Sequence, residues 1–128
     1  MARFFVAVAD SVFPNLDPAK AVLSEIGAEL ELAADSSPES VMKLAADADA
    51  VLVTYAKINA DMIRQMKKVR IISRFGIGVD NVDLDAATQK GIVVTKVPDY
   101  CIDEVSDHAM ALLLSAVRKI PLANDQVH

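Results

Sequence analysis

The sequence predicts an α/β protein with a doubly wound parallel sheet of five strands, followed by a long C-terminal helix. Three observations support this fold class. Short apolar runs alternate with amphipathic segments from end to end, the apolar runs contain few interspersed polar residues, and capping residues precede the amphipathic segments. Runs that are apolar throughout are typical of strands buried on both faces, as in a parallel sheet between layers of helices.

The predicted strands are five short runs rich in apolar residues. They comprise residues 4–9, 30–32, 50–53, 71–72 and 92–94, and the second is the weakest of them. Aromatic and β-branched residues favour the pleated backbone of a strand. Because a short helical crossover separates each run from the next, the pattern predicts a flavodoxin-like sheet.

Four helices are predicted between these strands, and each begins at a residue type that caps helices. The predicted N-caps are Asp17, Ser37, Asn59 and Asp83, and a proline follows the first two. Such side chains accept hydrogen bonds from the free N–H groups of the first turn, and proline suits the first helical position. Gly27 and Gly91 are placed to end the first and fourth helices.

The last predicted helix, residues 103–119, is apolar around nearly its whole circumference. A helix of this kind needs burial on more than one side. We interpret it as a helix that packs between two domains of a larger protein. A dimer interface is the alternative.

Composition and charge exclude several classes of protein. A chain of 128 residues suffices for one domain with a core of its own. The net charge of -5 argues against a nucleic-acid partner, because such proteins carry a basic stripe. No segment approaches the roughly 20 apolar residues that cross a membrane. The single Cys101 excludes an internal disulfide and fits a reducing compartment, so we expect a cytoplasmic protein.

Residues 74–81, Arg-Phe-Gly-Ile-Gly-Val-Asp-Asn, carry the main functional signal. They do not form a dinucleotide fingerprint, because Asn81 stands where the third glycine is required and the segment follows the fourth strand rather than the first. Two alternating glycines at the carboxyl end of a parallel strand can leave backbone N–H groups pointing into the crevice, where they suit a carboxylate. A tight turn that needs positive φ and binds nothing is the alternative.

A longer pattern extends this segment to Arg118. Residues 74–84 are followed by Ala86-Ala87, by Lys-Gly-Ile-Val-Val at 90–94 and by Val-Pro-Asp-Tyr-Cys-Ile-Asp-Glu-Val-Ser-Asp-His-Ala at 97–109. In order and spacing this pattern resembles the D-isomer-specific 2-hydroxyacid dehydrogenases. The resemblance covers essentially the entire chain.

The resemblance implies a two-domain enzyme that transfers hydride between a small 2-hydroxy or 2-oxo acid and NAD or NADP. Residues 1–102 correspond to its flavodoxin-like substrate-binding domain. Residues 103–128 correspond to the interdomain hinge helix and to the start of the linker to a Rossmann domain. Members of this family also lead us to expect a homodimer.

The resemblance also implies where substrate lies. The backbone N–H groups of Ile77 and Gly78 would hold the substrate carboxylate, which agrees with the argument from the two glycines. Tyr55 and Ala56 match a second loop, which borders the part of the substrate that varies between enzymes. A half-exposed ring that packs on its own loop is the alternative for Tyr55.

Two further positions near the hinge helix match residues that have roles in the family. Cys101 corresponds to a place where some members carry a substrate-contacting asparagine, although a small buried filler is the alternative. Val105 matches a position that approaches the cofactor. His108 does not correspond to the family's acid–base histidine, and we interpret it as structural. Lys96 departs from the asparagine that is common among related sequences.

In such enzymes the catalytic arginine, carboxylate and histidine belong to the inserted Rossmann domain, as does the glycine-rich cofactor loop. We therefore expect no catalytic residue and no metal site within these 128 residues, and we expect the chain alone to be inactive and to bind no NAD. An isolated piece of a longer enzyme and a truncated gene product are both compatible with this reading. The alternative from another class is a non-catalytic binding or dimerisation module that pairs through residues 103–119. A response-regulator receiver is disfavoured, because the third strand ends Val53-Thr54 without a phosphoacceptor aspartate.

Overall fold

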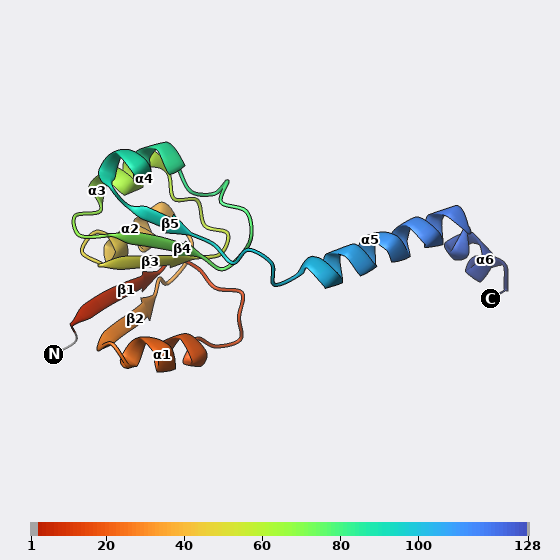
Figure 1. Cartoon of the computed structure of the whole chain (residues 1–128), viewed down its shortest axis with the longest axis horizontal. Coiled ribbons are helices and arrows are strands. Elements are labelled where there is room, and N and C mark those ends of the chain that lie inside the picture. Colours follow the sequence, from red (N-terminus) through yellow and green to blue (C-terminus); the bar gives the residue numbers. More distant parts are fainter. Residues whose placement is uncertain (1–2, 128) are drawn as a thin grey trace. The chain divides into compact units, whose positions relative to one another are not determined.

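The computed structural model describes residues 3–127, and its elements follow the alternation that the sequence predicts (Figure 1). In chain order they are β1 Phe4–Val8, α1 Asp17–Ser24, β2 Ala28–Leu32, α2 Pro38–Ala45, β3 Ala50–Val53, α3 Ala60–Gln65, β4 Ile71–Arg74, α4 Leu84–Lys90, β5 Val93–Thr95, α5 Ile102–Val117 and α6 Ile120–Val127. The chain divides into two compact units, Met1–Pro98 and Asp99–His128. Each unit is described by itself.

The first unit is built around one sheet in which all neighbouring strands are parallel. The strand order is β2-β1-β3-β4-β5. The chain thus winds outward from β1 in both directions, and the order changes direction between β1 and β3. This topology confirms the predicted flavodoxin-like, doubly wound α/β fold.

The face of the sheet that carries α2, α3 and α4 holds the core. Val51, Val53 and Ile72 point to this face and are 0% exposed. They pack against apolar side chains of the three helices, namely Val41, Ala45, Met62, Ile63 and Ala87. We call this the covered face.

The opposite face carries α1 and is only partly filled. Strand pairing aligns Val6, Ala50, Ile71 and Val93 in one row across this face, and Val93 is 57% exposed. Helix α1 lies against β2 and buries none of its own residues. We call this the open face. The expectation that the strands are buried on both faces is therefore wrong for β4 and β5 on this side of the sheet, whereas Val6 and Val8 of β1 are buried there.

The predicted boundaries hold in most places, with three corrections. Strand β2 begins at Ala28, and β4 continues to Arg74, the first residue of the glycine-containing segment. Asp17 does not cap α1: it is the first residue of the helix, Leu16 takes the N-cap position, and Asn15 Oδ1 accepts a hydrogen bond from Asp17 N at 3.0 Å. The other three predicted caps, Ser37, Asn59 and Asp83, accept hydrogen bonds from N–H groups of their first turns.

The second unit consists of two helices where the sequence predicted one. Helix α5 ends at Val117, two residues before the predicted end, and Lys119 takes a φ of 52° that no α-helix continues. Pro121 then fits the first turn of α6, where its missing N–H costs no intrahelical bond. Within residues 3–127, no helix has both the length and the apolar character needed to span a bilayer.

Candidate substrate-binding site

The carboxyl ends of β1, β3 and β4 are neighbours, because all three strands are parallel and adjacent in the sheet. The loops that leave these ends are residues 9–16, 54–59 and 75–83. In open α/β sheets, ligands bind at this edge, beside the point where the strand order changes direction. The site is therefore built from these loops.

Asp10, directly after β1, fixes the loop that leaves β3. Its Oδ1 accepts a hydrogen bond from Thr54 N at 2.8 Å, and its Oδ2 accepts one from Tyr55 N at 2.7 Å. The Thr54 hydroxyl donates to the Asp10 backbone carbonyl at 3.2 Å. Hydrogen bonds to an ionised acceptor are stronger than neutral ones, so the carboxylate holds both backbone N–H groups firmly.

Arg74, at the end of β4, joins the β3 loop to the glycine-containing segment. Its Nε donates to Thr54 O at 3.0 Å, and its Nη1 donates to Gly78 O at 2.9 Å. The guanidinium carbon also lies 5.9 Å from the centre of the Tyr55 ring, within cation–π range. The side chain therefore bends back over its own loop and leaves its positive charge beside the two glycines.

The two glycines leave space for neighbouring side chains and do not adopt a backbone conformation that only glycine favours. A Cβ at Gly76 would lie 2.8 Å from Arg74 Nη1, and a Cβ at Gly78 would lie 2.8 Å from Asp80 Oδ1. Positive φ occurs instead at Gly27 and Gly91. The alternative of a turn that requires positive φ at residues 76 and 78 is thus wrong: the glycines leave room for the Arg74 and Asp80 side chains.

The backbone N–H groups of Ile77 and Gly78 donate no hydrogen bond to any residue of the described part of the chain. Both residues are half-buried. Two successive N–H groups of this kind, beside an arginine side chain, provide donors and positive charge for one small anion. This geometry is compatible with the predicted carboxylate site.

The structure brings four of the six predicted site residues into one region. Tyr55 and Ala56 lie on the loop that Arg74 ties to Gly78; the Tyr55 side chain is 66% exposed, whereas Ala56 is buried. Cys101 and Val105 belong to the second unit, where Cys101 is half-buried and Val105 is exposed.

Sequence reasoning missed the residues that connect these loops. Arg74 and Asn81 were quoted as part of the motif but received no role, and Asp10 and Thr54 received none in this site. Most of their partners lie 20 to 45 residues away in the sequence. For Asp10, Thr54 and Arg74, the local signal was a position one or two residues after a predicted strand.

The residues of this edge do not fit the pyrophosphate of a dinucleotide. The Arg74 side chain lies over Gly76 and Gly78, where a phosphate would need bare backbone. Helix α4 starts only at Leu84, and the Asp83 carboxylate already accepts a hydrogen bond from Ala86 N at its first turn. The described residues also contain no group of three or more His, Cys, Asp or Glu side chains placed to hold a metal ion.

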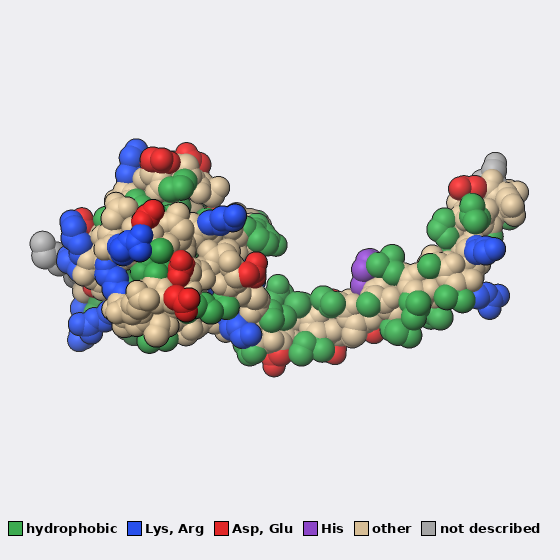
Figure 2. Space-filling view, turned by 90° about the horizontal axis from the view of Figure 1, so that it is seen from above, with side chains coloured by type: hydrophobic (Ala, Val, Ile, Leu, Met, Phe, Trp, Pro, Cys, Tyr) green, Lys and Arg blue, Asp and Glu red, His purple; other side chains and the backbone are tan. Residues whose placement is uncertain are grey.

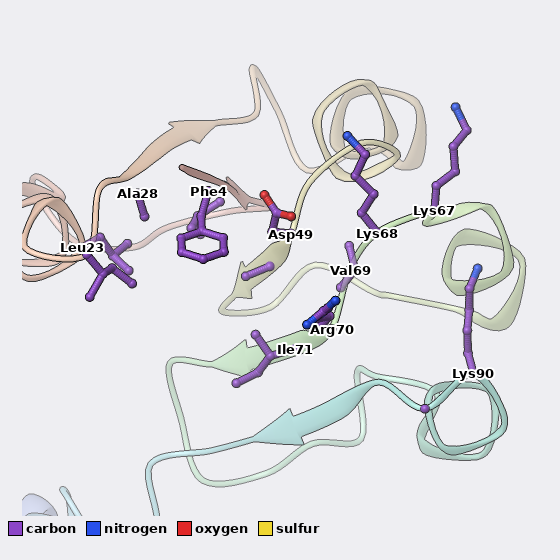
Figure 3. A pocket seen from close by; sticks show the side chains of 14 residues that line it. Phe4, Leu23, Ala28, Asp49, Lys67, Lys68, Val69, Arg70, Ile71 and Lys90 are labelled. Atoms are coloured by element: carbon purple, nitrogen blue, oxygen red, sulfur yellow. The ribbon is translucent and has the colours of Figure 1, made fainter. Parts of the chain in front are cut away.

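A cavity of about 830 Å³ lies at the other edge of the sheet, on the open face (Figure 3). Phe4, Ala50 and Ile71 contribute to its apolar lining, and Lys68 and Arg70 lie at its border. These residues stand at the amino ends of the strands, opposite to the loops of residues 54–59 and 75–83. Cavity size therefore does not mark the candidate site.

Comparison with known proteins agrees with the fold and identifies the family. Residues 6–120 match the family described as D-isomer specific 2-hydroxyacid dehydrogenase, catalytic domain. D-3-phosphoglycerate dehydrogenases from Methanocaldococcus jannaschii and Archaeoglobus fulgidus are 39% and 40% identical to this chain over 111 and 102 residues. These matches cover 86% and 79% of this chain but only 21% and 19% of the relatives, so the chain spans about a fifth of their length.

A solved structure shows the same architecture. The NAD+-bound 3-phosphoglycerate dehydrogenase of Entamoeba histolytica superposes with a TM-score of 0.78 at 28% sequence identity, over 91% of this chain and 40% of that one. The family match includes β3, β4 and their loops, and it ends within α6. The chain belongs to the D-isomer specific 2-hydroxyacid dehydrogenase family.

Proposed function

We propose that this chain supplies the substrate-side half of an NAD- or NADP-dependent enzyme that interconverts a D-2-hydroxy acid and its 2-oxo acid. One observation carries the proposal. The N–H groups of Ile77 and Gly78 are free of partners among the described residues and lie beside the Arg74 side chain, at the carboxyl end of a parallel strand.

In this proposal the substrate carboxylate accepts hydrogen bonds from Ile77 N and Gly78 N. The charge of Arg74 favours the bound anion, although its Nε and Nη1 remain bonded to backbone carbonyls. The exposed Tyr55 ring borders the variable part of the substrate, and Ala56 completes the same loop. Such contacts orient C2 of the substrate and do not themselves move the proton or the hydride.

The nicotinamide cofactor, when bound to the parent enzyme, supplies or accepts the hydride. We assign its binding, and the residues that transfer the proton and polarise the substrate carbonyl, to a second domain joined through residues 103–128. Cys101 on the substrate side and Val105 on the cofactor side are the residues of the hinge helix that we place near the reaction. We expect the parent enzyme to be a homodimer.

Titration of the 128-residue chain with pyruvate, followed by ¹⁵N NMR, tests the carboxylate site. We expect the amide resonances of Ile77 and Gly78 to shift most. Gly76→Ala should weaken this response, because its Cβ would force the Arg74 guanidinium out of place. Gly91→Ala is the control, since its Cβ meets no atom within 4 Å and its strain lies at the end of α4. Shifts spread evenly over the chain, or none at all, would contradict the proposal.

The same proposal predicts that the 128-residue chain does not oxidise NADH in the presence of glyoxylate, hydroxypyruvate or pyruvate. The assay is the absorbance of NADH at high protein concentration. If NADH oxidation co-purifies with the 128-residue chain, these residues hold a complete active site and the prediction is wrong.

A dimerisation module remains the second candidate, and one observation favours it. Hydrophobic side chains run along α5 (Figure 2), and Leu112, Leu113 and Leu114 are each more than half exposed. Light scattering separates the candidates. A tight dimer that binds no carboxylate would favour the dimerisation module over the substrate-side half.

A further inference from the structure

Thr54 is the residue at which the three loops of the site meet. Its N–H donates to Asp10, and its carbonyl accepts hydrogen bonds from Arg74 Nε at 3.0 Å and from Asn81 Nδ2 at 3.4 Å. Its side chain is bonded as well, to the Asp10 backbone, and the residue is only 3% exposed. Every polar group of Thr54 therefore has a partner within the protein.

Asn81 ties the same loop to the segment that follows the two glycines. Its Nδ2 donates a second, shorter hydrogen bond to Ala56 O at 3.0 Å, and its backbone carbonyl accepts one from Ile58 N at 2.8 Å. Ile58 O in turn accepts from Asp83 N at 3.0 Å. Because Ile58 and Val82 form a parallel bridge and are both buried, residues 56–58 and 81–83 are held together as a unit.

The side-chain amide of Asn81 uses its nitrogen for these bonds, while its oxygen has no partner among the described residues. Its nitrogen faces two carbonyl oxygens, which accept but cannot donate, so its orientation is fixed. Its Oδ1 is buried and finds no donor within residues 3–127. An unsatisfied buried acceptor is destabilising, and it is tolerated where the opposite end of the same group makes bonds that the fold needs.

We propose that Asn81 is the positioning residue of the carboxylate site: by clamping the carbonyls of Thr54 and Ala56, it sets the place of the Ile77 and Gly78 N–H groups relative to the Tyr55 loop. The proposal rests on the function proposed above. Asn81 follows Gly78 by three residues, so displacement of its side chain is transmitted through a short stretch of backbone to both N–H groups.

A substitution of Asn81 can test the positioning of the loops without removing a charge, whereas a substitution of Arg74 changes both. Loss of Arg74 would remove a bond to Gly78 O and, at the same time, the positive charge that favours an anion. Asn81 is uncharged, and its side-chain nitrogen is directed at protein carbonyls. An effect of Asn81 on carboxylate binding therefore reports the geometry of the loops.

The test uses the 128-residue chain with pyruvate as the probe, in the wild type, Asn81→Ala and Asn81→Leu. Leucine is nearly isosteric with asparagine and is also uncharged, but it has no N–H to donate to the two carbonyls. Ser37→Ala is the matched control, because the Ser37 side chain also bonds a backbone group, Ser40 N, but caps α2 outside the three loops of the site. Each variant is measured by NMR titration, and its unfolding is followed in urea.

We expect both Asn81 variants to bind pyruvate more weakly and to raise its dissociation constant about three- to tenfold. This range corresponds to the net contribution of a typical hydrogen bond. Without ligand, the amide resonances of Tyr55, Ile77 and Gly78 should also move. Ser37→Ala should lower stability and leave the dissociation constant for pyruvate unchanged.

The possible failures are distinct. If the wild type does not bind pyruvate at Ile77 and Gly78, the proposed function fails and the role of Asn81 fails with it. If the wild type binds but both Asn81 variants bind equally well, the positioning role alone is overturned. If Asn81→Ala does not fold, the dissociation constant of Asn81→Leu and the amide resonances of its ligand-free form decide the question.

Discussion

The two faces of the sheet are made by the same strands, yet they differ in how completely they are buried. On the covered face Ile72 is 0% exposed, whereas its neighbour Ile71 points to the open face and is only half-buried. Both are isoleucines in β4. The difference comes from the layer above them: α2, α3 and α4 fill one face, while α1 lies against β2 and leaves the row from Ala50 to Val93 partly exposed. Residue type alone therefore does not report burial in this sheet.

The largest expected effect compares these two neighbours directly. Ile72→Ala should lower the free energy of unfolding by about 2–5 kcal/mol, because it leaves a cavity among fully buried side chains. Ile71→Ala should lower it by about 1 kcal/mol, since its surroundings are open. Urea denaturation of the 128-residue chain measures both. Equal losses would mean that the open face is as well packed as the covered one.

A smaller effect concerns the helices that lie on the two faces. Asp83→Ala should destabilise the protein by about 1 kcal/mol, because its carboxylate caps α4 through Ala86 N. Asp17→Ala should change stability by less than about 0.5 kcal/mol, because Asp17 lies inside α1 and caps nothing. Thermal unfolding of the two variants gives the comparison. A larger loss of stability for Asp17→Ala than for Asp83→Ala would contradict our assignment of the helix N-caps.

The smallest effect lies just before α2, the first helix of the covered face. Hydrogen bonds from the side chain and then from the backbone of Ser37 lower the pKa of the Asp35 carboxyl below its ordinary value. The folded state thus favours the carboxylate, so this contribution to stability is present above the unfolded pKa and is lost as pH falls through the folded one. NMR titration of Asp35 measures the shift.

Variants of the adjacent serines test the cause of that shift. Ser37→Ala removes the side-chain hydrogen bond, and the pKa of Asp35 should rise toward its ordinary value. Ser36→Ala is the control and should leave the pKa where it is. An unchanged pKa in Ser37→Ala would assign the shift to the backbone N–H alone.

Much of the fold could be predicted because the information is local. The apolar runs gave all five strands, and three of four caps were correct, since capping depends on residues within one turn. The open face could not be foreseen, because non-alternating apolar runs look the same whether a helix covers them or not. Helix α6, which follows the break at Lys119, was also missed.

The candidate site also has one part that the sequence predicts and another that requires the structure. The two glycines after β4 mark the proposed carboxylate site in the sequence, because their spacing is local. The bonds that hold the loops in place join Asp10 to Thr54 and Thr54 to Arg74 across separate strands. A single sequence does not contain the pairing of such distant residues, so the assignment of space-making glycines and of a clamping asparagine required the structure.

The anchoring of Thr54 bears on how the substrate range of such an enzyme can change. Its backbone and side chain are bonded to the protein on all sides, and the next residue, Tyr55, has its N–H held by Asp10 while its ring remains mostly exposed. Under the proposed function, residue 55 can therefore be replaced during evolution, or by an engineer, with little disturbance to the backbone of the proposed carboxylate site. The proposal thus makes selectivity for the substrate's side group and binding of its carboxylate separately mutable in this domain.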